Sequence, residues 1–473
     1  MESLKTSLVN TKWLFCTLAS LITGFMLFFM CLNEGRRTGN IFLLASFSSS
    51  TVEQANISLY FDSPSNLAMS PQYSGSSTST PPVNATPFPL KELDTVSQQA
   101  KAVEGSVVVT PLPESSKANS SVALDGIISQ EEQCDIFEGR WVYDEERYPL
   151  YHAWQCPFLS DQVSCRKNGR PDSGYEHWRW EPRGCEIPRF NGRDMLERLR
   201  GKRVVIVGDS LNRNQWESLT CLLYSSVRPS RAVVKAQGSL YKIFRALDYG
   251  CSVEFFWSPF LVTLEEMKGG NNTKVLKLDR LDGSAKRWRG ADILVFNTGH
   301  WWTHRGKMKV WDYFEKRGKL VEEMEGDMPF RTAIQAWARW VDQAVDPTKT
   351  IVFFRSISPE HKRENNHWCY NQTKPITNET YIQLFPRSMV NIVERTIQKM
   401  RTPVKYLNIT RLSEYRRDAH TMVYTSRQGK LLTPDQQMRP ESFADCSHWC
   451  LPGLPDTWNV LIYEILRNHS NVL

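Results

Sequence analysis

Val204-Val205-Ile206-Val207-Gly208-Asp209-Ser210 carries the strongest structural signal in this chain of 473 residues. Its four β-branched apolar residues predict a buried strand, and residues 211–224 predict a helix that follows the serine. A serine between a strand and a helix is where α/β hydrolytic and acyl-transfer enzymes often place a nucleophile. We therefore predict that Ser210 is a nucleophile and that Gly208 keeps the turn open for it.

The surrounding sequence has an α/β rhythm. Strands are predicted at 203–207, 252–257, 292–297, 350–355 and 404–408, and helices at 211–224, 331–345, 380–400 and 456–468. Strands that alternate with helices predict an α/β fold, with a mainly parallel sheet and helices on both faces. Because sites gather at the carboxyl ends of parallel strands, Ser210, Asn297 and Ser356 are expected to share one edge.

Asp445-Cys446-Ser447-His448 supplies the groups that a serine nucleophile needs. His448 is the candidate base, and Asp445 is the candidate partner that orients its imidazole. During acyl transfer, the backbone N–H of Ser210 beside Gly208 and the side-chain amide of Asn297 are the candidate donors to the oxyanion.

Residues 13–32 form an uncharged, mostly apolar segment that is long enough to span a bilayer. It is longer than the apolar region of a cleaved signal peptide, so we expect a signal anchor, with residues 1–12 as a cytosolic tail. Residues 33–132 are rich in Ser, Thr and Pro and predict a flexible stem. The expected topology is one transmembrane span and a luminal bulk.

Cysteines and glycosylation sequons indicate an oxidising lumen. Nine of the 11 cysteines lie outside the apolar segment, a density that is typical of disulfides. Cys446-x-His448-x-Cys450 has zinc-ligand residue types, but its spacing is unlike common zinc sites and luminal thiols oxidise, so no metal is expected. Eight Asn-x-Ser/Thr sequons are candidates for N-glycosylation. They lie at Asn56, Asn84, Asn119, Asn271, Asn371, Asn378, Asn408 and Asn468.

Residues 133–200 are dense in Cys, Trp, Arg and Pro and predict a small, disulfide-stapled lobe before a catalytic domain at 201–473. The lobe's tryptophans, among them Trp178 and Trp180, either pack the lobe or stack on sugar rings. Residues 1–133 carry a net charge of −4 and residues 134–473 a net charge of +11. Such a basic domain attracts an acidic polymer, and nucleic acid is a poor candidate in this compartment.

Two long motifs are very similar to the signature of the plant trichome birefringence-like family. The first is Val207-Gly208-Asp209-Ser210-Leu211-Asn212-Arg213-Asn214-Gln215-Trp216-Glu217-Ser218-Leu219. The second is Ala444-Asp445-Cys446-Ser447-His448-Trp449-Cys450-Leu451-Pro452-Gly453-Leu454-Pro455-Asp456-Thr457-Trp458-Asn459. Residues 295–302 and 407–410 also fit, as does the Cys/Trp-rich lobe, so the resemblance runs from about residue 134 to the C-terminal helix.

This resemblance implies a Golgi type II membrane protein that O-acetylates a plant cell-wall polysaccharide, on a fold related to SGNH/GDSL esterases. Ser210 would accept an acetyl group from a co-substrate, acetyl-CoA or a donor derived from it, and would pass it to a sugar hydroxyl. His448 and Asp445 would complete the triad, and no bound cofactor is implied. The implied disulfides are Cys134–Cys185, Cys156–Cys221, Cys165–Cys450 and Cys369–Cys446, which leaves Cys251 free and buried.

Other functions stay open. The same triad could transfer its acetyl group to water, which would make the protein a polysaccharide acetylesterase. A non-catalytic glycan-binding protein would instead use the basic face and the tryptophans. The acceptor is also open: the net charge of +11 favours pectin over xylan or mannan.

Overall fold

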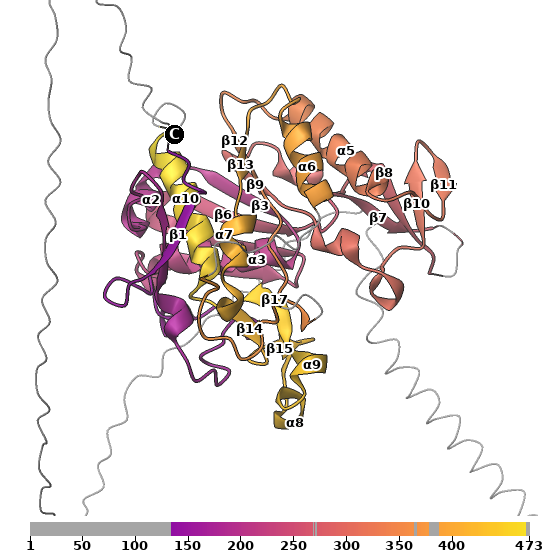
Figure 1. The fold of residues 1–473 in the computed structure, drawn as a ribbon. Helices are drawn as coiled ribbons and strands as arrows, with labels where there is room; N and C mark the ends of the chain where they lie inside the picture. The colour runs from indigo at the N-terminus through magenta and orange to yellow at the C-terminus, as the bar shows by residue number, and fades with distance from the viewer. Residues whose placement is uncertain (1–133, 268, 270–271, 364–366, 378–386, 470–473) are drawn as a thin grey trace, which may run out of the picture. The chain divides into compact units, whose positions relative to one another are not determined.

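The computed structural model describes residues 134–267, 269, 272–363, 367–377 and 387–469 (Figure 1). The expected tail (1–12), transmembrane segment (13–32) and stem (33–132) all lie outside these residues, as do Asn271 and Asn378. Within the described ranges, no helix combines the length and the apolar character that a membrane crossing needs. The three sequon asparagines inside those ranges, Asn371, Asn408 and Asn468, are exposed.

A seven-stranded sheet forms the centre of the fold, in the order β13-β12-β9-β3-β6-β5-β4. The first five strands are parallel, and β5 and β4 extend the sheet in antiparallel fashion. This arrangement confirms the predicted mainly parallel sheet. The strands are β3 (Arg203–Gly208), β4 (Ala232–Gln237), β5 (Tyr241–Ala246), β6 (Cys251–Trp257), β9 (Ile293–Phe296), β12 (Ile351–Arg355) and β13 (Val404–Leu407).

Helices cover both faces of the sheet (Figure 1), so the central strands are mostly apolar. Along β3, Val204 and Ile206 pack on one face with helices α3 (Ser210–Tyr224) and α10 (Leu454–Arg467). Val205 and Val207 pack on the opposite face with α5 (Met328–Ala344) and α6 (Arg387–Ile397). The predicted helices are therefore confirmed, although α5 begins three residues earlier than expected and the expected residues 380–386 lie outside the described ranges.

The N-terminal lobe is short of regular structure, as its composition predicts. It contains a two-stranded antiparallel sheet, a seven-residue helix and two short 3₁₀ helices. Trp141 and Trp180 pack edge to face inside it, with their indole N–H groups donating to backbone carbonyls, so these two serve packing. Trp154, by contrast, is 79% exposed. The elements are β1 (Gly139–Tyr143), η1 (Ala153–Gln155), η2 (Gly174–His177), β2 (Trp178–Pro182) and α2 (Gly192–Arg198).

Among the described residues there are four disulfides, and they are the pairs that the family resemblance implies. Cys134–Cys185 closes the lobe on itself, whereas Cys156–Cys221 ties it to α3. Cys165–Cys450 ties the lobe to the segment just after His448, and Cys369–Cys446 fixes the other side of that segment. Cys251 is free and buried. The lobe is therefore bonded covalently to the residues around the candidate site.

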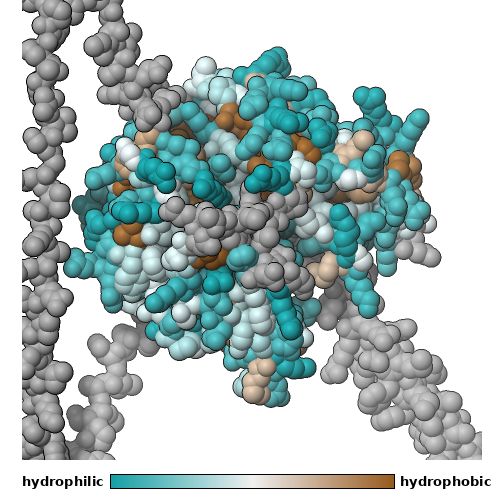
Figure 2. All heavy atoms as spheres, in the orientation of Figure 1, coloured by the Kyte–Doolittle hydropathy of each residue, from teal (hydrophilic) through white to brown (hydrophobic). Residues whose placement is uncertain are grey.

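The remaining elements cover the edges of the sheet. A four-stranded sheet in the order β11-β10-β8-β7 packs beside α5, and two small hairpin-like pairs, β14–β17 and β15–β16, lie near the carboxyl edge. On the face shown in Figure 2, apolar residues are scattered among hydrophilic ones. The strands are β7 (Val262–Glu266), β8 (Lys274–Leu281), β10 (Tyr313–Lys316), β11 (Lys319–Val321), β14 (His420–Met422), β15 (Ser426–Arg427), β16 (Lys430–Leu431) and β17 (Asp445–Trp449). The helices are α4 (Ala285–Trp288), α7 (Thr410–Glu414), α8 (Pro434–Gln437) and α9 (Pro440–Phe443), with 3₁₀ turns η3 (Pro229–Arg231), η4 (Leu247–Tyr249), η5 (His300–Thr303), η6 (Gly306–Met308) and η8 (Arg417–Ala419).

Candidate active site

Ser210 is the first residue of α3 and is separated from β3 by Asp209 alone, at the predicted junction of strand and helix. The Asp209 carboxylate caps the helix by accepting from the backbone N–H of Leu211 at 2.9 Å. Position 208 requires glycine because the backbone of Asn297 passes close by: a Cβ at Gly208 would lie 2.7 Å from the carbonyl oxygen of Asn297. The tight turn therefore presents Ser210 at the carboxyl edge of the sheet, where the first N–H groups of the helix have no intrahelical partner.

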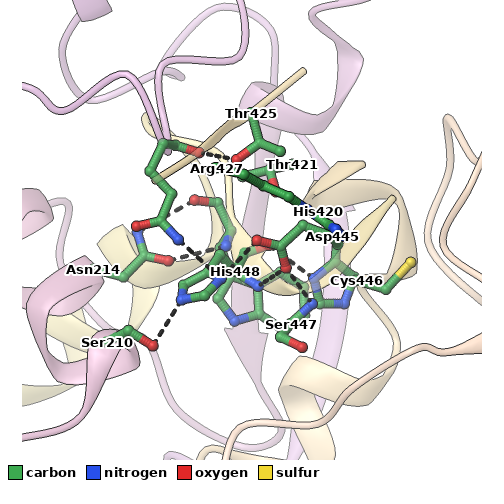
Figure 3. A network of polar contacts seen from close by, with 12 residues as sticks. Ser210, Asn214, His420, Thr421, Thr425, Arg427, Asp445, Cys446, Ser447 and His448 are labelled. Atoms are coloured by element: carbon green, nitrogen blue, oxygen red, sulfur yellow. Dashed lines mark hydrogen bonds and ion pairs between the residues drawn. The ribbon is translucent and has the colours of Figure 1, made fainter. Parts of the chain in front are cut away.

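His448 and Asp445 meet Ser210 from β17 (Figure 3). The Oγ of Ser210 lies 2.7 Å from Nε2 of His448, and Nδ1 of His448 lies 2.7 Å from Oδ2 of Asp445. Both side chains on β17 are 17% exposed, so the site is sheltered but open to a ligand. The three residues form the continuous chain of contacts that a serine nucleophile, its base and the base's orienting group require.

Asp445 is held as an ionised group. Its second oxygen accepts from the backbone N–H groups of Ser447 and His448, each at 3.0 Å. Burial alone would raise the pKa of Asp445, but the adjacent His448 and these hydrogen bonds outweigh it and hold the pKa well below its ordinary value. The carboxylate can therefore accept from Nδ1 of His448 and leave Nε2 free to take a proton from Ser210.

The strand that carries the base is fixed to α3 from behind. Asn214, one turn after Ser210, accepts from the backbone N–H of Trp449 at 2.9 Å and donates to its carbonyl at 3.2 Å. Because Trp449 follows His448 directly, this pair of hydrogen bonds sets the spacing between the serine and the histidine. Asn214 lies within the quoted motif Val207–Leu219, but no role for it was predicted.

Gln162 brings the N-terminal lobe into contact with the candidate triad, and sequence reasoning missed this residue. Its Nε2 lies 3.3 Å from Nδ1 of His448, and its Oε1 accepts from the guanidinium of Arg213 on α3. Its backbone carbonyl accepts from the hydroxyl of Thr425 at 2.8 Å. Nearby, Ser160 donates to the buried carboxylate of Glu217 through its N–H and its hydroxyl. The loop between Cys156 and Cys165 thus forms one wall of the site.

A charged cluster lies on the other side of β17. Glu360 accepts from the hydroxyl of Ser447 at 2.8 Å, contacts Nζ of Lys362 at 2.6 Å and lies 3.5 Å from Nδ1 of His300. Burial opposes ionisation of Glu360, but these cations and hydrogen bonds hold its pKa well below the usual range. Nε2 of His300 lies 2.6 Å from the carbonyl oxygen of Ser358. No sequence signal pointed to Glu360.

Two further histidines support the backbone of His448. Nδ1 of His420 lies 2.9 Å from the His448 carbonyl, and its ring stacks on Trp449 with centroids 3.7 Å apart. Nε2 of His420 lies 2.7 Å from Nδ1 of His361. Burial lowers the pKa of His361 to about 4 and that of His420 well below its usual value. These rings serve as fixed supports for β17.

Asn297 lies at the end of β9, beside Gly208, and is 1% exposed. Its Nδ2 lies 3.4 Å from the carbonyl of Arg355, so its role as a donor to the oxyanion stays a prediction. Ser356, the third residue expected at this edge, accepts from the backbone N–H of Ile409 and Thr410, which ties β12 to the segment after β13. Its contacts are those of a structural residue.

The cysteines of Cys446-x-His448-x-Cys450 are both in disulfides and are not metal ligands. No cluster of metal-ligating side chains occurs among the residues that the structure describes. The geometry places a serine in contact with a candidate base, and that base in contact with an ionised carboxylate. The first N–H groups of a helix lie at the same edge of the sheet. This is the apparatus of serine-dependent acyl transfer or ester hydrolysis.

Comparisons with known proteins agree with this class. Residues 187–465 match the model of PC-Esterase, described as a GDSL/SGNH-like acyl-esterase family found in Pmr5 and Cas1p. Residues 132–186 match the PMR5 N-terminal domain. The fold and the site thus define a GDSL/SGNH-like acyl-esterase domain with a PMR5-type N-terminal lobe. The chain belongs to the PC-Esterase family, among the trichome birefringence-like proteins.

Three relatives illustrate the similarity. The chain is 44% identical over 363 residues to Protein trichome birefringence-like 1 of Arabidopsis thaliana, covering 74% of this chain and 64% of the relative. It is 42% identical over 353 residues to Protein trichome birefringence of the same species, covering 72% and 57%. It is 43% identical over 356 residues to Xylan O-acetyltransferase 6 of Oryza sativa subsp. japonica, covering 72% and 64%. The chain therefore spans less than two thirds of the length of these relatives.

Proposed function

We propose that this protein is a polysaccharide O-acetyltransferase that works through an acetyl-serine intermediate on Ser210. The observation that carries the proposal is the chain of two 2.7 Å contacts from Ser210 through His448 to Asp445. The names of several relatives, including xylan O-acetyltransferases of rice, support an acetyl group as the group transferred and a polysaccharide as the acceptor. The acetyl donor is a co-substrate, acetyl-CoA or a compound derived from it.

In the first half-reaction, Nε2 of His448 takes the hydroxyl proton of Ser210 while Oγ attacks the acetyl carbonyl of the donor. The negative charge on the carbonyl oxygen develops beside the N-terminus of α3, where the N–H of Ser210 and the Asn297 amide are the candidate donors. As the donor's leaving group departs, it takes the proton from His448. Ser210 is then acetylated and His448 is again a base.

In the second half-reaction, a sugar hydroxyl gives its proton to His448 and attacks the acetyl carbonyl on Ser210. The serine oxygen leaves and takes that proton back, which restores the free enzyme. Water in place of the sugar would give acetate, the outcome of an acetylesterase. Which product forms depends on how well the acceptor is held and water excluded beside Ser210.

We further propose that the protein is a single-pass type II membrane protein of the Golgi, with residues 134–473 in the lumen. The four disulfides and the exposed sequon asparagines at 371, 408 and 468 support an oxidising, glycosylating compartment. The uncharged segment 13–32 supports one span. The acceptor is a cell-wall polysaccharide such as xylan or pectin.

The test is acetyl transfer by the purified full chain carrying Ser210→Ala, with Ser230→Ala as the matched control because Ser230 is exposed in η3. We expect no acetyl on a xylan or pectin oligomer with Ser210→Ala and full transfer with Ser230→Ala. Normal transfer by Ser210→Ala would contradict the assignment of the nucleophile. Acetyl found only as free acetate with the wild type would favour an esterase, and no acetyl on either protein or product would favour a glycan-binding protein.

A further inference from the structure

Three arginines are buried in the part of the chain that the structure describes, namely Arg170, Arg355 and Arg416. Arg170 and Arg416 each contact a carboxylate, that of Asp172 at 2.9 Å and that of Asp418 at 3.0 Å. Arg355 is 0% exposed, yet no carboxylate oxygen among the described residues lies within 4.0 Å of its guanidinium nitrogens. A buried charge is normally paired, because its removal from water is costly. The unpaired guanidinium of Arg355 therefore calls for a functional reason.

Arg355 lies at the same sheet edge as the turn that presents Ser210. It ends β12, and β9 and β3 are in register with that strand, so Asn297 and Gly208 occupy the neighbouring positions along the edge. The backbone carbonyl of Arg355 accepts from the side-chain amide of Asn297 at 3.4 Å. The backbone of Arg355 thus contacts one of the two candidate donors to the oxyanion.

Asn212, in the first turn of α3, receives the guanidinium of Arg355. Nε and Nη2 of Arg355 donate to Oδ1 of Asn212 at 3.1 and 2.9 Å, and Nδ2 of Asn212 donates to the carbonyl of Val207 at 2.7 Å. The guanidinium also lies over the ring of Trp458, 4.6 Å from its centroid. All these partners are uncharged, so they orient the positive charge without neutralising it. The charge is therefore held beside the helix turn that begins with Ser210.

Asp209 is the nearby carboxylate that Arg355 attracts without contact. One oxygen of Asp209 caps α3, whereas Oδ2 is buried and has no hydrogen-bond partner among the described residues. Burial lowers the pKa of Arg355 to about 10 and Asp209 opposes that fall, so the guanidinium is charged at neutral pH. A carboxylate directly before the nucleophile repels the oxyanion that forms on the acyl carbonyl. A fixed positive charge beside the same turn offsets this repulsion.

We propose that Arg355 is a positioning residue of the acyl-transfer site, which holds a positive charge beside the nucleophile turn through Asn212, offsets Asp209 and favours the oxyanion formed at Ser210. This inference rests on the proposed function and adds a residue to its machinery. Arg355 does not touch the reacting atoms, so its effect is electrostatic. A residue that only braced β12 against α3 would act independently of the charge on Asp209, and this difference makes the two roles separable.

A double-mutant cycle between Arg355 and Asp209 on the full chain tests the inference. The readout is the rate at which a fluorophosphonate probe modifies Ser210, because Oγ displaces fluoride while negative charge gathers on the phosphoryl oxygen. Arg355→Gln should slow this modification at least about tenfold. In the chain carrying Asp209→Asn, whose oxygen can still cap α3, the same substitution should cost less than about threefold. Equal losses in the two backgrounds would overturn the inference.

Arg416→Gln is the matched control, because Arg416 is also buried and lies 4.5 Å from the centroid of the Trp141 ring, yet is paired with Asp418. It should lower the unfolding temperature, and its effect on the rate should be the same with and without Asp209→Asn. Arg355→Lys keeps a positive charge and should stay within about threefold of the wild-type rate. If Arg355→Gln does not fold, Arg355→Lys carries the test, and a tenfold loss in that variant would overturn the role of the charge.

Acetylation by a labelled donor is measured last, on the same chains. Arg355→Gln should lower the single-turnover rate of Ser210 acetylation and leave the half-saturating donor concentration unchanged, because the charge acts on the transition state. A fluorophosphonate rate that depends on Arg355, in a protein that never takes up an acetyl group, would uphold the inference and refute the proposed function. Failure of the probe to modify Ser210 in the wild type would overturn the inference itself.

Discussion

Replacing Asp445 by asparagine should inactivate the protein without unfolding it. An asparagine can keep its oxygen toward the backbone N–H groups of Ser447 and His448, which the carboxylate accepts at 3.0 Å. Its NH₂ then faces Nδ1 of His448, which lies 2.7 Å from the carboxylate in the wild type. Because that nitrogen must now accept, the ring proton moves to Nε2 and points at Ser210. His448 can then no longer take the serine's proton.

The expected loss of acetylation rate is large because the substitution removes both the basic nitrogen that faces Ser210 and the ion pair between His448 and Asp445. Loss of the correct tautomer in a serine triad costs about 10³–10⁴ in rate, or about 4–5.5 kcal/mol of transition-state stabilisation. The assay is single-turnover acetylation of Ser210 by labelled donor, followed by intact-protein mass spectrometry. Asp435→Asn, in an exposed turn of α8, is the matched control. A rate for Asp445→Asn within about threefold of the wild type, with an unchanged unfolding temperature, would refute the reasoning.

Burial raises the pKa of the Asp456 carboxyl to about 7. The native state therefore keeps a proton that the unfolded chain releases near pH 4. The free energy of unfolding should consequently fall as the pH rises from about 4 to 7. Asp456→Asn should flatten this fall in calorimetric unfolding temperatures, and an equal fall in the variant would contradict it. Gln162→Ala removes the lobe's packing contact with the His448 ring and the acceptor for Arg213, and should lower the acetylation rate about tenfold, whereas the exposed Gln237→Ala should not. Cys165→Ser opens the bridge to Cys450 and should cost about 2–4 kcal/mol in denaturant unfolding, and an unchanged midpoint would speak against its role.

The centre of the fold could be predicted because its signals are local. The β-branched run at 204–207 is buried on both faces of a parallel sheet, and such strands are apolar without interruption. Ser210 could be proposed from the same stretch, because a serine at the junction of a strand and a helix is where α/β hydrolytic and acyl-transfer enzymes often place a nucleophile. His448 and Asp445 could be named because a serine nucleophile requires a base and a carboxylate, and their motif offers both.

Residues that act through distant loops could not be predicted. Gln162 reaches His448 only because two disulfides hold the lobe against α3 and β17, and a glutamine in a loop carries no pattern of its own. Glu360 lies after β12, and its contacts depend on His300, which comes from η5, and on Ser447, which comes from β17. The sheet of β7, β8, β10 and β11 was also missed, because its short strands mix charged and apolar residues and draw stability from packing on α5.

The most direct test of the account is to trap the intermediate. The wild-type chain is incubated with an isotopically labelled acetyl donor and no acceptor, and peptides are mapped by mass spectrometry before and after a polysaccharide acceptor is added. We predict that the label sits on Ser210 before the addition and on the glycan after it. Label that never enters the Ser210 peptide, or that stays there when the acceptor is present while the glycan becomes acetylated, would contradict the claim.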